Sequence, residues 1–369
     1  MVAVRGLLRS LHSNFGFEAQ NAILIETDLS MAGYTGEKVP AMQKHMIDAM
    51  EAIPGAQFVG LIDELPLWGG RSAASVFTDE TTDLRAANAV GQSLLYRISP
   101  EYFHAAGTAV LFGRTFTWHD DKDAPRVAVV NQEFAHRIFG SVTGAMGRYY
   151  KTSDGKRIQV VGVVENGKYE SLTEDSQPAM FFPLPQSPSS PTWVVVRSSH
   201  DPQQMATAMR STLRDLDTGL PFSIQTWNKE LDSSTVLFGA RMATVSLGVL
   251  GVMGAMLSIT GVFGMAAYSV SKRMRELGIR MALGAQRKQV LQAALGRALQ
   301  LLAFGSAAGL LLGIFASRVL AFIVYQATPR DPLVLTGVVF AMLLLGLLAT
   351  WIPAQRALSI DPLRLLREE

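Results

Sequence analysis

Residues 242–271 read MATVSLGVLGVMGAMLSITGVFGMAAYSVS, thirty residues without an Asp, Glu, Lys or Arg. A helix of about 20 apolar residues crosses the hydrocarbon core of a bilayer, so this run is long enough to tilt or to continue beyond the membrane as a stalk. Two further charge-free runs follow, at 298–317 and 332–355. Three such runs close together disfavour the alternative, in which each run is a buried helix of a large soluble protein. The sequence predicts three transmembrane helices, at about 242–268, 298–321 and 332–353.

The formal net charge of +2 hides two oppositely charged parts of the chain. Residues 1–240 carry 20 Lys and Arg against 26 Asp and Glu, whereas residues 241–369 carry 13 against 5. Seven of those 13 basic residues lie in the loop 272–297, where Glu276 is the only acidic residue. Basic loops stay in the cytoplasm, so we expect this loop and the C-terminus inside and residues 1–240 outside. Basic charge around apolar spans is typical of an inner membrane face, and we predict a lipid bilayer and no nucleic acid as partner.

Residues 1–240 show the pattern of a mixed α/β domain. Short runs rich in β-branched and aromatic residues predict strands at 22–28, 57–61, 94–98, 127–131, 158–164, 193–197 and 222–226. Helical spacing predicts helices at 39–52, 132–139 and 202–216, and a further helix at 228–241 that runs straight into the first span. Asp201 before Pro202 is a suitable cap for the third of these helices. The predicted fold class is an α+β extracytoplasmic domain followed by an all-α membrane domain of three transmembrane helices.

The cytoplasmic loop begins with residues 272–285, KRMRELGIRMALGA. Its apolar residues alternate with Arg273, Arg275, Glu276 and Arg280, which predicts a short, basic, amphipathic helix flush with the membrane. Two interpretations stay open. The segment is either a solvated loop that carries positive-inside charge or a docking helix through which a cytoplasmic partner transmits force.

A family resemblance starts in this loop. Residues 275–285, RELGIRMALGA, resemble the E-[IL]-G-I-R-x-A-[IL]-G-A signature of the MacB/FtsX-like ABC transporter permease family. PAQRA at 353–357 and DPLRLLRE at 361–368 resemble the ending of the same family. Residues 1–240 resemble the MacB-type periplasmic core domain. The residues that carry this resemblance are SPEYF at 99–103, GRTF at 113–116, VVNQ at 129–132, VVGVV at 160–164, and Tyr169. The resemblance extends over essentially the whole chain and is closest to the C-terminal half of the duplicated orphan permeases of acidobacteria.

The resemblance implies a permease subunit of the bacterial inner (plasma) membrane and not an enzyme. In that family two permease units pair, and a separate cytoplasmic ABC ATPase docks on short cytoplasmic helices and drives motion of the periplasmic domain. Relatives export small molecules or peptides, extract lipoproteins or regulate cell-wall hydrolases, so we expect export. A regulator that transmits force to a periplasmic partner without transport, and a non-functional permease fragment, stay open as alternatives. By position, the ATPase-coupling residues are Arg273, Arg275, Glu276, Leu277, Gly278, Ile279, Arg280, Gly284 and Ala285 within the segment 272–297.

Domain boundaries follow from the same pattern, which starts with a span before the periplasmic domain. We expect residues 1–14, MVAVRGLLRSLHSN, to be a remnant of that missing first span. We assign 15–235 to the MacB-like periplasmic core domain and 236–369 to the FtsX-like permease domain. The chain is then the second half of a longer permease, a protein with a misassigned start, or a decayed fragment.

Small residues mark one face of the second predicted span. Gly305, Gly309 and Gly313 recur at a spacing of four, which places them on one side of a helix and allows close helix packing. Packing within this chain and contact with a second permease unit are both open. No ionisable residue lies inside any predicted span, which disfavours a proton-coupled or ion-coupled carrier.

Catalytic and cofactor motifs are weak. Residues 162–169, GVVENGKY, nearly spell a phosphate loop, but Tyr169 stands where Ser or Thr would hold magnesium, and the stretch also fits a strand, a turn and a strand. His119 beside Asp120, Asp121 and Asp123 lacks a second histidine for zinc, although a metallohydrolase stays a third hypothesis. The chain has no cysteine. We therefore expect no catalytic, cofactor-binding or metal-binding residue, with ATP bound by a partner subunit.

Overall fold

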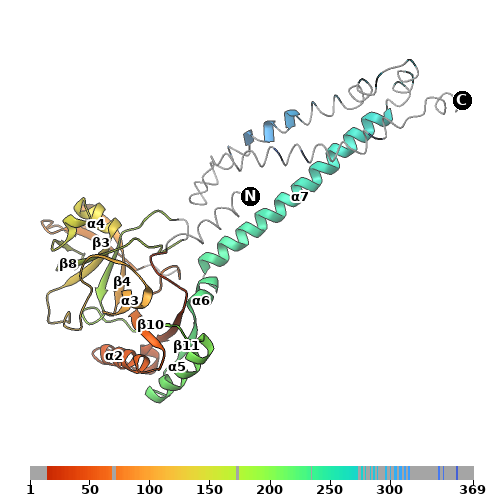
Figure 1. Cartoon of the computed structure of the whole chain (residues 1–369). Helices are drawn as coiled ribbons and strands as arrows, with labels where there is room; N and C mark the ends of the chain where they lie inside the picture. Colours follow the sequence, from red (N-terminus) through yellow and green to blue (C-terminus); the bar gives the residue numbers. More distant parts are fainter. Residues whose placement is uncertain are drawn as a thin grey trace. The chain divides into compact units, whose positions relative to one another are not determined.

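The structure is a computed structural model that describes residues 15–272 except 69–71, 172–173 and 234, together with single residues and short runs between 276 and 355 (Figure 1). The chain divides into two compact units, one of them Arg9–Ala240 and the other Met1–Leu8 with Arg241–Glu369. The first unit, called the outer domain below, contains the whole of the β-sheet. The predicted remnant at 1–14 lies outside the described residues.

Eleven strands form one sheet in the order β11-β1-β10-β2-β4-β3-β7-β8-β6-β9, with β5 paired to β8. The strands are β1 (Ala22–Asp28), β2 (Ala56–Ile62), β3 (Ala73–Thr78), β4 (Gly91–Ile98), β5 (Val110–Gly113), β6 (Val127–Asn131), β7 (Tyr149–Lys151), β8 (Arg157–Val164), β9 (Ala179–Pro183), β10 (Pro191–Ser198) and β11 (Phe222–Thr226). The described helices are α2 (Lys38–Glu51), α3 (Tyr102–Ala106), α4 (Gln132–Phe139), α5 (Pro202–Leu216), α6 (Trp227–Ser233) and α7 (Thr235–Lys272), with 3-10 turns at Leu29–Ala32, Ala86–Asn88 and Thr143–Ala145.

The sheet has two parts: the strands of one part pair in a closed ring, and those of the other part do not. Strand β9 pairs with β6 and also returns to pair in parallel with β4, so β4, β3, β7, β8, β6 and β9 make a closed ring of pairings. We call these six strands the closed ring. The strands β11, β1, β10 and β2 are antiparallel neighbours that join the ring through one residue pair, Ile62 with Ile98, and we call them the open half.

Helices α2 and α5 cover one face of the open half and lie at the opposite end of the domain from α4 (Figure 1). In α2 the residues Val39, Met42, Met46 and Met50 are buried, because a spacing of three or four keeps them on one side of a helix. They pack against alternate strand residues, among them Ile25 of β1. The predicted helix at 39–52 is therefore confirmed within one residue at each end.

The helix α5 begins as its sequence predicts. The Asp201 side chain accepts hydrogen bonds from the backbone N–H groups of Gln203 and Gln204, at 2.9 and 3.1 Å, and Pro202 occupies the first turn. A capping carboxylate of this kind satisfies N–H groups that have no partner inside the helix. Its buried side chains, Met205, Met209 and Leu213, join the core beneath α2.

The closed ring has a core of its own, shared with α4. The Asn131 side chain, fully buried at the end of β6, accepts from the Phe134 backbone N–H at 2.9 Å and so caps α4. The Phe134 ring meets the Tyr150 ring of β7 edge to face, with centroids 5.1 Å apart. Val130, Val160 and the other members of this cluster are mostly β-branched or aromatic, as strand geometry favours.

All seven predicted strands are present, three of them with the predicted bounds, and the predicted helices at 132–139 and 202–216 are α4 and α5. The prediction omitted four strands, β3, β5, β7 and β9, and the five-residue helix α3. These strands are three to six residues long. Short length alone does not explain the omission, because the five-residue strands β6 and β11 were predicted.

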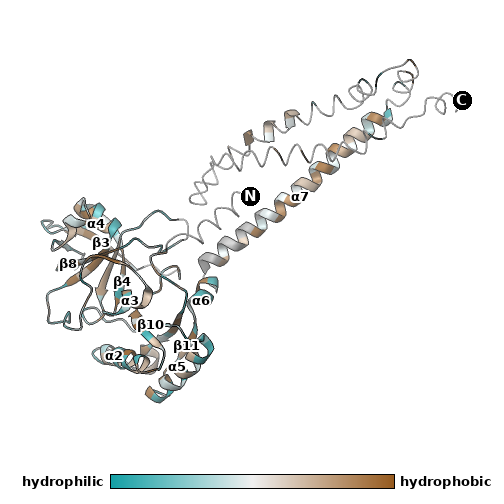
Figure 2. Ribbon diagram, in the orientation of Figure 1, coloured by the Kyte–Doolittle hydropathy of each residue, from teal (hydrophilic) through white to brown (hydrophobic). Residues whose placement is uncertain are grey.

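The helix α7 is 38 residues long. Its part Gly248–Lys272, 25 residues, is the helix within the described residues that is long and apolar enough to cross a membrane, and Figure 2 shows its hydrophobic character. Helix α6 precedes it, so the predicted helix at 228–241 corresponds to α6 and the start of α7, with residue 234 outside the described residues. The predicted spans at about 298–321 and 332–353 lie largely outside the described residues.

Candidate functional site

Two segments far apart in the sequence meet at one aromatic cluster of the outer domain. Phe17, near the first described residue, stacks on Trp227 of α6 with ring centroids 4.6 Å apart and an interplanar angle of 4°. Phe15 stacks in turn on Phe17, with centroids 5.7 Å apart. Trp227 is fully buried. Because α6 is the last helix before α7, this cluster fixes the point where the chain leaves the sheet.

The segment that carries Phe15 is bonded closely to its surroundings. The backbone N–H of Lys168 donates to the Phe15 carbonyl oxygen at 2.9 Å, and the Thr108 hydroxyl donates to the Gly16 carbonyl at 2.7 Å. Gly16 has φ +75°, and a Cβ placed there would lie 2.5 Å from the Cα of Gly167. The close approach and the left-handed backbone both require glycine.

A second attachment holds α6 through a side-chain hydrogen bond. The Trp68 indole N–H donates to a Glu230 carboxylate oxygen at 2.6 Å, and Glu230 is buried. Burial raises the pKa of Glu230 above its ordinary value, the charge of Glu26 raises it further, and the bond from Trp68 acts against both. We call Phe15, Phe17, Trp68, Trp227 and Glu230 the aromatic junction.

The phosphate-loop-like stretch supports this junction structurally. The carbonyl oxygen of Tyr169 accepts from the Leu67 N–H at 2.7 Å, so the loop after β8 is bonded to the residue before Trp68. The Glu174 carboxylate accepts from the backbone N–H groups of Glu170 and Ser171, at 3.0 and 3.1 Å, and also from that of Tyr169. The prediction of a strand directly after the turn is wrong, since the next strand, β9, begins at Ala179.

Burial explains the state of the ionisable groups in that loop. It raises the pKa of the Tyr169 phenol above its ordinary value, so this hydroxyl stays neutral. It also raises the pKa of the Glu174 carboxyl, against the three backbone hydrogen bonds. This stretch makes hydrogen bonds to its own loop and to Leu67, so it acts as a structural brace.

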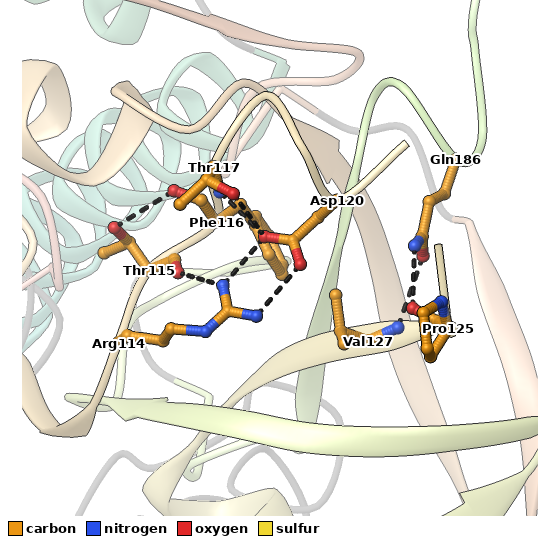
Figure 3. A network of polar contacts seen from close by, with 8 residues as sticks. All are labelled: Arg114, Thr115, Phe116, Thr117, Asp120, Pro125, Val127 and Gln186. Atoms are coloured by element: carbon orange, nitrogen blue, oxygen red, sulfur yellow. Dashed lines mark hydrogen bonds and ion pairs between the residues drawn. The ribbon is translucent and has the colours of Figure 1, made fainter. Parts of the chain in front are cut away.

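The acidic turn near His119 is held by an ion pair, as Figure 3 shows. Asp120 accepts two hydrogen bonds from the Arg114 guanidinium, at 2.7 and 2.9 Å, and one from the Thr117 N–H at 2.8 Å. Burial opposes ionisation of Asp120, but these bonds outweigh it and lower its pKa. In the part of the chain that the structure describes, no group of three His, Cys, Asp or Glu side chains could hold a metal ion.

Most predicted coupling residues lie outside the described residues. Of the nine, the structure describes Glu276 and Ile279, both helical and exposed. The Leu283 N–H donates to the Ile279 carbonyl at 3.0 Å, as in a helix. The packing glycines Gly305 and Gly309 are also helical, and Gly313 is outside the described set. The roles of all these residues remain predictions.

Family comparisons cover both parts of the chain. The family model for the MacB-like periplasmic core domain matches residues 1–212, and the model for the FtsX-like permease C-terminal region matches residues 248–362. The chain belongs to the MacB/FtsX-like ABC permease family. The two matches confirm the predicted family. They also identify the outer domain as a MacB-like periplasmic core domain. A permease is the membrane component of a transporter.

Named relatives of this permease are distant. The "Pyoverdine export ATP-binding/permease protein PvdT" of Pseudomonas entomophila is 24% identical over 304 residues, which cover 76% of this chain and 45% of that protein. The "Uncharacterized ABC transporter permease YknZ" of Bacillus subtilis is 26% identical over 74% of this chain and 69% of its own length. The periplasmic region of MacB from Actinobacillus actinomycetemcomitans aligns with a TM-score of 0.40 and 15% identity, over 60% of this chain and 95% of that one. The chain thus spans about half the length of the ATP-binding/permease relatives that it matches.

The aromatic junction was missed by the sequence analysis. Its residues are separated by up to about 215 positions and match no motif. One signal was available: Phe15 and Phe17 lie at one end of the predicted core domain and Trp227 lies near the other. Aromatic residues at both ends of a domain suggest, but do not specify, a shared cluster.

Proposed function

We propose that this permease works in the bacterial inner membrane with a separate cytoplasmic ABC ATPase, which binds ATP, and that it passes ATP-driven motion to its periplasmic domain for export. The observation that carries the proposal is the attachment of α6 to the outer domain immediately before the long helix α7. Trp227 is buried in the stack with Phe17, and Glu230 is bonded to Trp68. A helix fastened at two points moves together with the domain that holds it.

The length of α7 supports the same function. At 1.5 Å per residue, 38 residues make a helix of about 57 Å, against a hydrocarbon core of about 30 Å. The part of α7 before the span Gly248–Lys272, residues 235–247, is a further helical segment that follows α6 along the chain. A continuous helix is stiff over this distance, so it suits a stalk that transmits displacement.

We further propose the topology and contacts that the sequence predicts. Three spans place residues 1–240 in the periplasm and the C-terminus in the cytoplasm, as the seven basic residues of 272–297 favour. The nine coupling residues would contact the ATPase, with Glu276 at their centre. The glycines at 305, 309 and 313 would pack against a neighbouring helix, either in this chain or in a second permease unit.

The coupling proposal is tested by co-purification of the full chain from its native membranes. Glu276→Lys is expected to lose most of the ATPase that co-purifies with the wild type, because it reverses the acidic charge in a basic segment. Gln286→Lys is the matched control, since it adds a lysine to the same segment at an exposed position. Equal ATPase recovery with both variants would refute docking at Glu276.

Export is tested by reconstituting the chain with the recovered ATPase in proteoliposomes. ATP-dependent movement of a substrate across the bilayer supports the proposal. ATP-dependent change in the periplasmic domain without flux would instead support a regulator that transmits force to a periplasmic partner. Absence of both would favour a non-functional fragment.

A further inference from the structure

A hollow of about 590 Å³ opens on the outer domain where β1, β10 and β11 come together. Its volume lies in the range of small-molecule sites, about 300–1,000 Å³. Glu26 of β1 lines it, paired across the strands with Trp193 of β10 and Ser223 of β11. Successive strand residues point to opposite faces, and Ile25 belongs to the core under α2 and α5. Glu26 therefore projects from the face that those helices leave uncovered.

Two tryptophans give the hollow an aromatic wall. The Trp68 ring is 40% exposed, and its edge-to-face contact with the buried Trp193 ring has a centroid distance of 5.3 Å. Met31, 74% exposed, and Phe222 add apolar surface to the lining. Exposed indole and thioether groups in a concave site are suited to a flat or greasy ligand group.

The lining carries an excess of negative charge. Arg97 is the one cationic side chain among the described residues that line the hollow, and its guanidinium is already bonded to Asp63 at 2.8 Å and to Ser187 at 2.9 Å. Glu64 also feels the charge of Arg97 and accepts a hydrogen bond from Ser72, whereas Glu26 accepts from the Ser223 hydroxyl at 3.3 Å. Among the described lining residues the acidic side chains Glu26, Asp28, Asp63 and Glu64 therefore outnumber the single cation, Arg97.

The hollow also touches the aromatic junction. Trp68 both lines the hollow and donates its indole N–H to Glu230 of α6. The charge of Glu26 acts on the same Glu230 carboxyl. A ligand that packs on the Trp68 ring, or neutralises Glu26, changes the interactions that hold α6.

We propose that the hollow binds a cationic amphiphile, an organic amine that carries an aromatic or apolar ring. The ligand ring packs on the exposed Trp68 side chain, which the buried Trp193 ring supports, and the ammonium group lies near Glu26 and Glu64, where cation–π and ionic attraction act together. The Trp68–Glu230 hydrogen bond passes the occupancy of the site to α6. The inference goes beyond export, because it concerns the binding of a small cation to the outer domain and the effect of that binding on α6. Neither step requires the ATPase.

Binding is tested with the full chain in phosphatidylcholine nanodiscs, by saturation-transfer NMR with three probes that share a benzene ring. They are benzyltrimethylammonium, benzyl alcohol and benzenesulfonate, and empty discs are the blank. We expect the cation to bind at least about tenfold more tightly than the other two. The double variant Glu26→Gln, Glu64→Gln should lose that preference, whereas Glu80→Gln, an exposed carboxylate outside the hollow, should keep it. Equal binding of the three probes, or an unchanged preference in the double variant, would overturn the proposal.

The proposed effect of ligand binding on α6 through the Trp68–Glu230 hydrogen bond, called the relay below, is tested by hydrogen exchange of the same samples, read by mass spectrometry. Saturating benzyltrimethylammonium should change the exchange of α6 in the wild type, although α6 contributes no residue to the lining. Trp68→Phe keeps an aromatic ring and removes the indole N–H, so it should retain the probe but lose the response at α6. Exchange of β1 and β10 checks that the variant is folded, and Glu230→Gln should also weaken the response. Bound probe without any response at α6 in the wild type would refute the relay.

Discussion

The closed ring and the open half of the sheet are packed in different ways. The ring core is built from β-branched and aromatic side chains around Phe134 and Tyr150, and its strands pair back on themselves. The open-half core contains five methionines, which are Met42, Met46, Met50, Met205 and Met209. Methionine is unbranched and adapts its shape, whereas β-branched side chains are stiff. From these side-chain types we expect the closed ring to be the more rigid part of the domain and the open half the more adaptable part.

The features to which we assign functions lie on the open half. Helix α6 packs on β1 and β11, and the hollow is lined by residues of β1, β10 and β11. The ring contributes the brace at Tyr169, which follows β8. If the domain responds to motion of α7 as we propose, a stiff part would serve as support and an adaptable part could repack. Three measurements test this division.

The largest expected effect comes from the ring core. Phe134→Ala should destabilise the domain by about 3–5 kcal/mol, because it leaves a cavity beside Tyr150. Hydrogen exchange of the full chain should show a greater loss of protection in β6 and β8 than in α2 and α5. Phe112→Ala is the control, since Phe112 on β5 is 43% exposed and its removal should change little. Equal loss in both parts would mean that the domain opens as one unit.

A smaller effect is expected at the junction. Gly16→Ala should loosen the Phe17–Trp227 stack, because its Cβ would overlap the backbone of Gly167. Gly33→Ala is a matched control: Gly33 also has a positive φ, +83°, but nothing lies within 4 Å of the added Cβ. Both variants carry the backbone strain of about 1–2 kcal/mol, and Gly16→Ala should carry about 1–3 kcal/mol more from overpacking. Exchange at α6 should increase in Gly16→Ala alone, and similar behaviour of the two variants would contradict the close approach.

The smallest effect is a pH dependence of opposite sign at two carboxyl groups, Glu230 and Asp120. The pKa of Glu230 is raised by burial, so the folded protein holds its proton more tightly, and stability falls as pH rises from about 4.3 through the raised value. The pKa of Asp120 is lowered by Arg114 and Thr117 despite its burial. Its contribution is complete above about pH 3.9 and is lost as pH falls through the lowered value.

Thermal midpoints of the full chain, measured against pH, separate the two groups. Glu230→Gln should flatten the decline in stability above about pH 4.3. Asp120→Asn should lower stability at neutral pH and lose that difference in acid. A matching pH profile for both variants would show that the two carboxyls stand in equivalent environments.

Local patterns determined much of this protein from its sequence alone. Charge-free length predicts the helix that contains Gly248–Lys272, and local sequence patterns predict α2, α4, α5 and seven of the eleven strands. Asp201 and Pro202 mark the start of α5, because capping depends on residues only two or three positions apart. The RELGIRMALGA motif indicates the family, since it depends only on the order of residues.

Only the tertiary structure decided how these pieces meet. Ring closure depends on the pairing of β9 with β4, and the junction depends on contacts between Phe17 and Trp227 and between Trp68 and Glu230. Glu26 lines the hollow because register places Trp193 and Ser223 beside it. Periodicity reports which side of a segment is buried, but it carries no information about which distant segment covers it. Register and closure settle that choice, and they arise when the whole sheet assembles.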